Sequence, residues 1–253
     1  MQADHNWQLR WIEMLEKIER VETPGELSQL LADLSAPTGP KVLAFANAHA
    51  LNALTSSQVF FDALLAADLV LRDGLGMATL FKLMNMSPGL NLNGTDLIPQ
   101  LIARFDGRAI AFYGTQEPWL ARGAHAAGQL APTSHFSAAG GFDESQAYVD
   151  LVRLHKPDLI VLGMGMPKQE LVAAALRAAI EHPCLIICGG AIIDFLGGRV
   201  PRAPHWMRKL GAEWLFRLLL EPRRLFQRYV IGNPVYLMRA HRLAARHKRP
   251  AVL

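Results

Sequence analysis

The sequence predicts an α/β fold in which a parallel sheet is flanked by helices, with a basic helical appendage after it. Short runs of Val, Ile and Leu alternate with segments whose apolar residues recur at the helical period. Strands that are apolar throughout are typical of parallel sheets buried on both faces. With 51% hydrophobic and 19% charged residues over 253 positions, the chain is long and apolar enough for a sizeable core.

The first half of the chain opens with two expected helices. Residues 7–20 have an amphipathic period, and Thr23-Pro24-Gly25-Glu26 supplies an N-cap, a first-turn proline and a capping-box acid. Asn47 and Thr95 are the expected caps of later helices. The expected helices span residues 7–20, 24–34, 48–54, 58–67, 77–86 and 95–103, and the expected strands span 41–46, 68–71 and 108–113.

The second half alternates strands and helices more regularly, and Gly197-Gly198 marks the end of the α/β part. We therefore expect an α/β domain over residues 1–198 and the appendage over 199–253. Further strands are expected to end near Phe136 and to span 158–162 and 185–188, with helices from about 118 and over 144–155, 167–180 and 191–196.

Two cysteines, Cys184 and Cys188, lie four residues apart in one apolar strand. Their side chains would share a face, but their Cα atoms would be too far apart to bridge, so free buried thiols are expected. Buried free thiols are typical of a cytoplasmic protein. Residues 7–21 carry too many charges for a signal peptide, and no run reaches the roughly 18 apolar residues of a membrane-spanning helix.

The appendage concentrates positive charge. Residues 199–253 hold 13 of the 26 Lys and Arg residues and only two acids, Glu213 and Glu221. Arginines interleaved with Trp, Phe and Leu indicate a surface that meets anions and apolar material together, such as an anionic membrane, a lipid diphosphate or nucleic acid. A second interpretation is core packing, because Met207, Leu210, Trp214 and Leu218 would share one helical stripe.

Four loops follow the expected strands and carry glycine or polar residues. In open α/β sheets, ligands bind outside the carboxyl ends of the strands, so these loops predict a binding site. They span Asn47–Ala50, Arg72–Gly76, Gly163–Lys168 and Gly189–Asp194.

Asp73 is the most prominent acid in these loops, because it follows an apolar strand and precedes Gly74 and Gly76. Glycine there would let the backbone approach a ligand closely. A cap or turn acid is an equally good interpretation from spacing alone. Asp194 has the same two interpretations, with a third in which it pairs with an arginine of the appendage.

Gly163-Met164-Gly165 resembles the start of a dinucleotide-binding loop, but Lys168 stands where the third glycine belongs. A nicotinamide-dependent oxidoreductase is therefore disfavoured, while a phosphate or carboxylate site at a helix start remains open. The sequence has no HExxH, Gly-x-Ser-x-Gly, Walker loop or Asp-x-Asp motif. We accordingly expect no metal and no cofactor.

Six ordered motifs between Val42 and Tyr229 resemble the WecG/TagA/CpsF glycosyltransferases (glycosyltransferase family 26). The residues that carry this resemblance are Ala67–Gly74, Gly163–Glu170, Gly189–Phe195, Arg202–Arg208, Glu213–Leu218 and Glu221–Arg224.

The resemblance implies a Rossmann-like domain and an inverting, metal-independent transfer of a sugar from a UDP-sugar to a polyprenyl-diphosphate-linked saccharide. It also implies a location at the inner face of the cytoplasmic membrane. From the aromatic and basic residues of the appendage themselves we expect contact with an anionic membrane surface and no nucleic acid partner, and a homo-oligomer is left open. Asp73 would be the catalytic base, and arginines of the appendage would contact the diphosphate. The expected substrate-binding residues are Asn47, Arg72, Gly74, Gly163, Gly165, Lys168, Gln169, Glu170, Gly189, Gly190, Asp194, Arg202, Arg217, Arg223, Arg224 and Arg228.

Two positions depart from the family pattern. Phe45 stands where the family commonly has threonine, and Arg72 stands where a proline often precedes the aspartate. A looser likeness to gum-type members favours glucose transfer in exopolysaccharide assembly. The alternative is an N-acetylmannosamine or N-acetylmannosaminuronate transferase for teichoic acid or an enterobacterial-antigen-type glycan. A non-catalytic membrane- or nucleic-acid-binding module is the remaining class.

Overall fold

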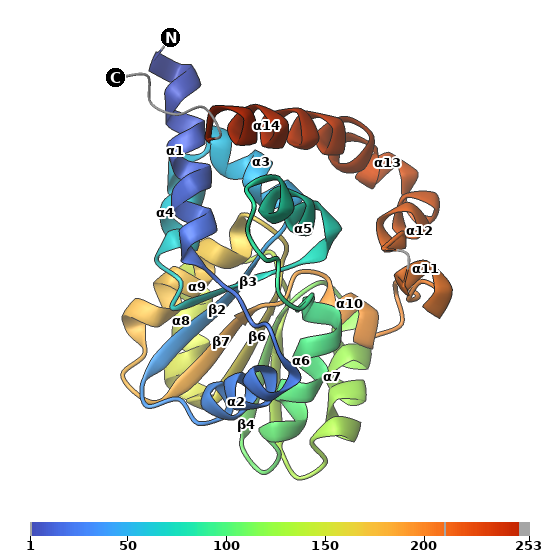
Figure 1. The fold of residues 1–253 in the computed structure, drawn as a ribbon. Coiled ribbons are helices and arrows are strands. Elements are labelled where there is room, and N and C mark those ends of the chain that lie inside the picture. The colour runs from blue at the N-terminus through green and yellow to red at the C-terminus, as the bar shows by residue number, and fades with distance from the viewer. Residues whose placement is uncertain (1, 210, 248–253) are drawn as a thin grey trace.

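The protein is built on one seven-stranded sheet in which every pair of neighbouring strands is parallel (Figure 1). The structure, a computed structural model, describes residues 2–209 and 211–247. The strand order is β1-β3-β2-β7-β6-β4-β5. The strands are β1 (Ile18–Glu19), β2 (Pro40–Ala46), β3 (Leu69–Arg72), β4 (Ala109–Gly114), β5 (His135–Ala139), β6 (Leu159–Gly163) and β7 (Cys184–Cys188).

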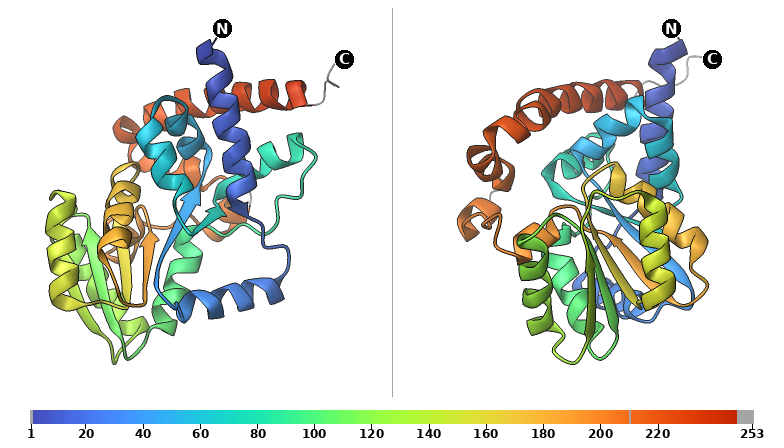
Figure 2. Two further views of the ribbon diagram at one scale, coloured as in Figure 1. Left: turned by 90° about the vertical axis from the view of Figure 1, so that its left-hand side faces the viewer. Right: turned by 180° about the vertical axis from the view of Figure 1, so that it is seen from behind.

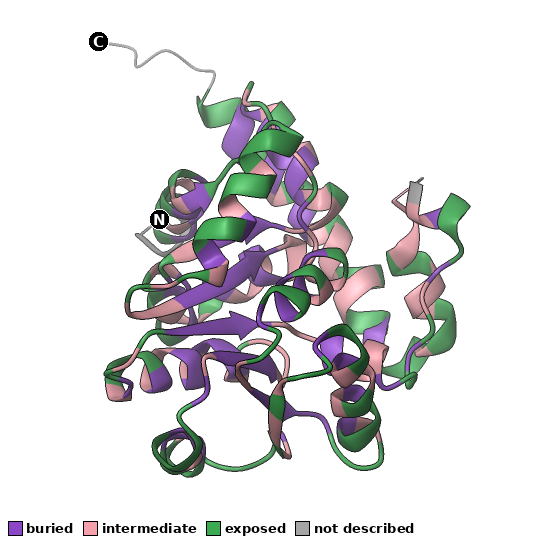
Figure 3. Cartoon of the chain, turned by 90° about the horizontal axis from the view of Figure 1, so that it is seen from below, coloured by how far each residue is buried: buried purple, intermediate pink, exposed green. Residues whose placement is uncertain are grey.

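Helices cover both faces of this sheet, as the apolar strands predict. Successive residues of β2, β4, β6 and β7 belong alternately to two hydrophobic clusters, one on each face. One face is covered by α1 (Gln2–Lys17), α3 (Ala48–Ser56), α4 (Gln58–Leu65), α5 (Gly74–Leu83), α8 (Ser145–His155) and α9 (Lys168–Ala179). The other face is covered by α2 (Pro24–Ser35), α6 (Gly94–Arg104), α7 (Trp119–Leu130) and α10 (Ile192–Leu196) (Figure 2). The five central strands, from β3 to β4 in the strand order, are mostly buried, as the purple arrows in Figure 3 show, whereas the edge strand β5 has no buried residue.

The prediction that the first helix runs to residue 20 is wrong at its end. The helix α1 stops at Lys17, and Ile18 and Glu19 pair with Val70 and Leu71 of β3 as an extra edge strand. A β-branched residue fits a pleated edge better than a helix end, and Ile18 is buried there. Pairing also satisfies backbone groups that β3 would otherwise leave open at the edge of the sheet.

Two predicted helix caps are confirmed, and one is corrected. The Thr23 hydroxyl accepts a hydrogen bond from the Glu26 backbone N–H, and the Asn47 side chain accepts one from Ala50. The cap of α6 is Asn93 and not Thr95, because the side-chain oxygen Oδ1 of Asn93 accepts a hydrogen bond from the Asp96 N–H at 3.0 Å. The free buried thiols are confirmed: Cys184 and Cys188 are both buried and unbridged.

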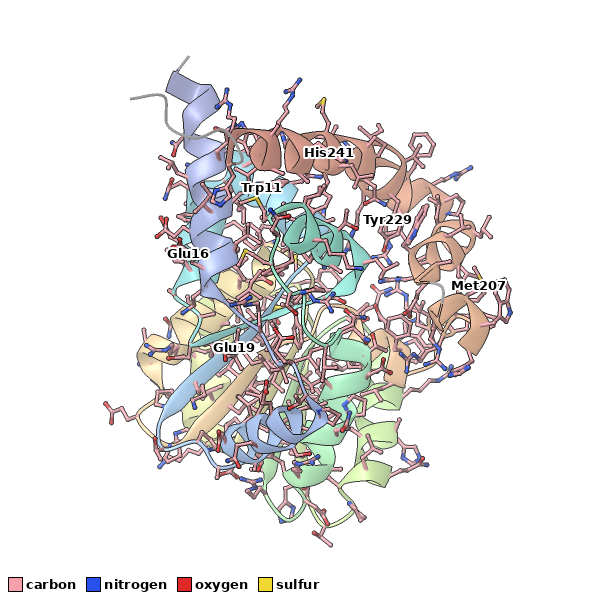
Figure 4. The ribbon with its side chains drawn as sticks, viewed as in Figure 1. Trp11, Glu16, Glu19, Met207, Tyr229 and His241 are labelled. Carbon is pink, nitrogen blue, oxygen red and sulfur yellow. The ribbon has the colours of Figure 1, made fainter. Side chains whose placement is uncertain are left out.

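The last helix of the predicted appendage, α14 (Gly232–His247), packs into the same core as the sheet. Tyr236 is buried, its ring stacks on Trp11 with centroids 5.2 Å apart, and its hydroxyl donates to the Gly76 carbonyl at 2.9 Å. Figure 4 shows Trp11 where α1 meets α14. This helix covers α1, α3 and α5, so this part of the appendage shares a core with the sheet. A domain boundary after Gly198 stays a prediction.

Between the sheet and α14 the chain forms what we call the arch, residues 205–231. It consists of α11 (His205–Lys209), α12 (Glu213–Leu220), α13 (Pro222–Phe226) and the π-helical turn η1 (Gln227–Ile231). The predicted continuous stripe from Met207 to Leu218 is wrong, because a break at Gly211 and Ala212 separates α11 from α12; Leu210 lies outside the described residues. No residue of α12 or η1 is buried. Figures 1 and 2 show the arch leaving α10 and returning to the fold at α14.

Two polar side chains are buried at the start of α9, where Gln169 is 1% and Glu170 is 2% exposed. The Gly190 backbone N–H donates to Gln169 Oε1 at 2.8 Å, and Gln169 Nε2 donates to Glu170 Oε1 at 2.8 Å. The other Glu170 oxygen is buried and has no hydrogen-bond partner. Burial raises the pKa of Glu170 from 4.5 to about 7.

This burial makes stability depend on pH in a stated direction. Because the folded-state pKa of Glu170 is raised, its contribution to stability is fully present below about pH 4.5 and is lost as the pH rises through about 7. The unfolding free energy of the wild type should therefore fall between pH 5 and pH 8, whereas Gln in Glu170→Gln does not titrate. We expect the difference in unfolding free energy between the two proteins to change by roughly 3 kcal/mol over this range, in favour of the variant. Urea unfolding of both proteins at the two pH values measures this difference, and parallel pH dependences would contradict it.

Candidate active site

The four predicted binding loops gather at one edge of the sheet. They follow β3, β2, β7 and β6, which are consecutive in the strand order. Because all four strands are parallel, their carboxyl ends lie on the same side, as the sequence predicts. The arch reaches this edge at Gly211, where an added Cβ would collide with the Leu75 side chain in the first turn of α5.

Asp73 lies at the end of β3, and its carboxylate does not cap the helix that follows. Its backbone N–H donates to the Ala46 carbonyl at 2.9 Å, continuing the pairing of β3 with β2. It stands at the N-cap position of α5, yet its side chain makes no capping hydrogen bond. Instead, Asn47 Nδ2 donates to Asp73 Oδ2 at 3.3 Å. The structure thus brings the two loop residues together and does not support the alternative of a cap.

The pKa of Asp73 is raised above its ordinary value, chiefly because the carboxyl is withdrawn from water. The hydrogen bond from Asn47 opposes this rise, and so do the positive charges of Arg228, Arg217 and Arg72. A carboxylate whose pKa is raised is suited to accept a proton.

Two of the cations near Asp73 come from the arch. Arg217 of α12 lies over the Phe195 ring of α10, 5.3 Å from its centroid, and Arg228 of η1 lies 5.4 Å from the centroid of the Tyr229 ring. The Nε groups of both arginines are buried without a hydrogen-bond partner. Figure 4 shows Tyr229 on the side of the arch that faces the sheet. The two guanidinium groups therefore retain free donor capacity beside a carboxylate.

The other predicted arginines lie elsewhere or have partners. Arg223 and Arg224 are exposed, and Arg224 pairs with Glu221 of the arch. Arg202 pairs with Asp96 at the start of α6, at 2.7 Å. A substrate contact by any of these three stays a prediction.

Arg72 is buried, and its side chain binds backbone carbonyl groups. Its guanidinium donates to the carbonyls of Pro88, Gly89 and Gly74, at 2.7, 3.0 and 3.0 Å. The Arg72 charge lowers the pKa of Asp73, but three of the guanidinium N–H groups are already used by backbone carbonyls. Its predicted role as a substrate ligand has no support from this geometry.

The predicted glycines divide into two groups. Gly74, Gly165 and Gly190 have φ of 85°, 76° and 62°, and an added Cβ at each would meet no atom within 4 Å, so these loops have open backbone at the sheet edge. Gly163 and Gly189 serve packing, because an added Cβ would lie 2.6 Å from the side chains of Ile193 and Ile192. The small residues there let α10 approach the sheet closely.

The polar residues predicted around the β6 and β7 loops also differ in placement. Lys168 is half-buried. The side chains of Gln169 and Glu170 are buried. Gln169 accepts a hydrogen bond from the Gly190 N–H, and Glu170 accepts one from Gln169. Asp194 accepts hydrogen bonds from Thr115 and from Arg199, the latter at 3.4 Å, so the alternative of an acid paired with the appendage is observed.

Some residues of the site carry no strong sequence signal. His49 lies two positions after Asn47, and burial together with the nearby Arg228 lowers its pKa from 6.5 to about 4. Its place inside a predicted binding loop could have identified it. Asn91, whose side chain accepts the Gly74 N–H at 2.9 Å, comes from an irregular segment that no pattern marks.

Phe45, at the position of the missing threonine, is 5% exposed and packs in the core beside the first residue of α6. An added Cβ on Gly94 would lie 3.5 Å from its ring.

Within the described part of the chain, no group of three or more His, Cys, Asp or Glu side chains is placed to hold a metal ion.

Comparison with known proteins agrees with this arrangement. The Glycosyl transferase WecG/TagA/CpsF family model matches residues 15–250. Relatives from Staphylococcus aureus strains COL and N315 bear the name N-acetylglucosaminyldiphosphoundecaprenol N-acetyl-beta-D-mannosaminyltransferase. Each is 26% identical over 216 residues, which covers 84% of this chain and 82% of the relative. Because the family match takes in the sheet, the loops and the arch together, the chain belongs to the WecG/TagA/CpsF family and is a glycosyltransferase.

Proposed function

We propose that this enzyme transfers N-acetylmannosamine from its UDP derivative to N-acetylglucosamine carried on a polyprenyl diphosphate. The relatives' names support the transferred sugar and the acceptor, and the resemblance to the family supports the UDP donor. The single observation that carries the proposal is the grouping of Asp73 with Arg217 and Arg228, whose Nε groups have no partner in the protein.

Asp73 acts as the general base in this proposal. It accepts the proton of the acceptor hydroxyl while that oxygen forms a bond to the anomeric carbon of the donor. The bond from the anomeric carbon to the diphosphate breaks on the opposite side, so the configuration inverts and UDP leaves. Asn47 orients the carboxylate through its hydrogen bond to Oδ2. The raised pKa of Asp73 makes it a stronger base than an exposed aspartate.

Arg217 and Arg228 stabilise the charge that develops on the leaving diphosphate. Guanidinium groups offer forked donors that match phosphate oxygens. Donors already in place before the reaction stabilise the transition state without further reorganisation. The open backbone at Gly165 and Gly190 lies at the neighbouring strand ends, where a nucleotide can approach closely.

The choice of sugar follows the relatives. Their names favour the N-acetylmannosamine alternative over the gum-type glucose interpretation. Phe45 removes a hydroxyl that family members commonly carry, and it does so from within the core, so we attribute to it no direct contact with the sugar.

A donor screen tests this proposal. Purified enzyme is incubated with UDP-N-acetylmannosamine, UDP-N-acetylmannosaminuronate, UDP-N-acetylglucosamine or UDP-glucose and a short-chain prenyl-diphosphate N-acetylglucosamine, and products are identified by mass spectrometry. We expect a disaccharide product with UDP-N-acetylmannosamine at a rate at least about tenfold above the other donors. Faster transfer of glucose would support the gum-type interpretation instead.

We further propose that the arch and α14 rest on an anionic membrane surface. Large apolar side chains of these elements are exposed beside the exposed Arg223 and Arg224. They are Trp206, Trp214, Leu215, Leu219, Leu220, Phe226, Val230, Ile231, Leu237 and Met238. Apolar residues mixed with cations are typical of helices that lie in a membrane interface. None of the helices in the described chain has the length and apolarity needed to cross a bilayer.

Vesicle co-sedimentation tests this surface. We expect Leu219→Asp combined with Ile231→Asp to lower the fraction bound to vesicles containing anionic lipid by several-fold, because both side chains would leave the apolar interface. Leu154→Asp is a matched control, since Leu154 on α8 is 74% exposed and Leu219 is 71% exposed. Equal binding of the double variant and the wild type would contradict the proposal.

A further inference from the structure

Arg72 is the last residue of β3, and its charged side chain is buried next to Asp73 although the reaction proposed above does not use it. Among the residues that the structure describes, it makes no ion pair with a carboxylate. Withdrawing a guanidinium group from water is costly unless its N–H groups find acceptors. The hydrogen bonds of Arg72 therefore indicate what this side chain does.

The guanidinium of Arg72 bridges two segments of backbone. Its Nη1 donates to the carbonyl of Gly74, the first residue of α5, at 3.0 Å. Its Nε and Nη2 donate to the carbonyls of Pro88 and Gly89, at 2.7 and 3.0 Å. Because the guanidinium group is planar and rigid, these three bonds together fix the start of α5 relative to the second segment.

The second segment, residues 87–91, which we call the strap, is itself fixed to the chain before α2. The Leu90 N–H donates to the Val21 carbonyl at 2.7 Å. Gly89 has φ of 60°, and an added Cβ there would lie 2.6 Å from the Val21 carbonyl oxygen, so the two backbones are in close contact. The strap is thus a firm support for the Arg72 side chain.

The strap also binds the backbone N–H of Gly74. The Asn91 side-chain oxygen Oδ1 accepts this N–H at 2.9 Å, and Arg72 Nη1 lies 3.5 Å from the same oxygen. The first N–H groups of a helix have no acceptor within the helix, and an aspartate at the N-cap commonly accepts one of them. Asp73 stands at the N-cap of α5, yet its side chain accepts none.

Gly74 is therefore held at its N–H by Asn91 and at its carbonyl by Arg72. Neither contact uses the Asp73 carboxylate, which accepts its hydrogen bond from Asn47 at 3.3 Å. Without Asn91, the N–H groups at the start of α5 would compete with Asn47 for that carboxylate.

We propose that Arg72 and Asn91 are positioning residues of the active site, which hold Gly74 from both sides so that the Asp73 carboxylate stays with Asn47 and does not cap α5. This inference rests on the proposed function, because it takes Asp73 as the base. A base that is oriented before the reaction needs no reorganisation in the chemical step. Loss of either residue should therefore lower kcat and leave nucleotide binding nearly unchanged.

Steady-state kinetics with the short-chain acceptor and the donor that the wild type uses tests this role. Asn91 is exposed, so its variants should fold. We expect Asn91→Ala to lower kcat at least about tenfold, while UDP affinity measured by calorimetry changes less than about threefold. Asn91→Asp keeps an oxygen acceptor for the Gly74 N–H, and its kcat should stay within about threefold of the wild type. Arg72→Lys keeps the charge but not the forked donors, and should lower kcat about fivefold or more.

The matched control is Ser57→Ala. Ser57 caps α4 through its hydroxyl, which accepts the Phe60 N–H at 3.2 Å, and it lies at the end of α3 that is opposite to Asn47. Its loss should lower stability as the loss of a helix cap does, while kcat stays within about twofold of the wild type.

An Asn91→Ala rate within about twofold of the wild type would overturn the inference, as would equal losses of kcat in Asn91→Ala and Asn91→Asp. Transfer of a different sugar by the wild type would contradict only the choice of donor, and the comparison of variants would still decide the role of Asn91. If the wild type shows neither UDP binding nor transfer with any donor, the proposed function fails and the inference falls with it.

Discussion

The partial burial of Asp73 is the constraint on which the site depends. The parallel sheet brings this carboxylate to its carboxyl edge beside Asn47, and burial there raises its pKa. Such a group must have compensating charge nearby. The core provides Arg72, but that side chain is already occupied by three backbone carbonyls. The remaining compensation comes from Arg217 and Arg228, far along the chain, so the arch completes a site that the sheet begins.

The arch can fill this role because it is anchored at both ends and lightly packed between them. Before it, Arg199 pairs with Asp194 and Arg202 with Asp96. After it, Asn52 donates to the Gly232 carbonyl at 2.8 Å, and α14 buries its inner side against α1, α3 and α5. The intervening helices keep few buried residues and expose many apolar ones. The same segment thus carries two arginines that act on Asp73 and also exposes apolar side chains together with Arg223 and Arg224.

The sequence predicts this fold well because its strands are apolar throughout and end in glycine or polar residues. The position of the binding edge follows from those ends alone. The edge strand at Ile18 could not be found, because a two-residue strand has no period of its own. The cap at Asn93 was missed since Thr95 is an equally good candidate by residue type.

Prediction within the site is less complete, because a motif does not distinguish contact from support. Arg72, Gln169 and Glu170 lie within the motifs, yet Arg72 and Gln169 bind backbone groups, and Glu170 accepts a hydrogen bond from the Gln169 side chain. Among the arginines, spacing cannot tell Arg228, which approaches Asp73, from Arg224, which pairs with Glu221. Arg228 belongs to the π-helical turn η1, and no sequence pattern marks the position of that turn.

The most direct measurement compares turnover and UDP binding of the Asp73→Asn variant with those of the wild type. The substitution keeps the shape of the side chain and removes its capacity to accept a proton. Our account predicts that kcat on the lipid-linked acceptor falls by roughly 10²- to 10⁴-fold, while UDP affinity stays within about threefold. Near wild-type turnover with UDP binding intact would contradict the assignment of Asp73 as the base.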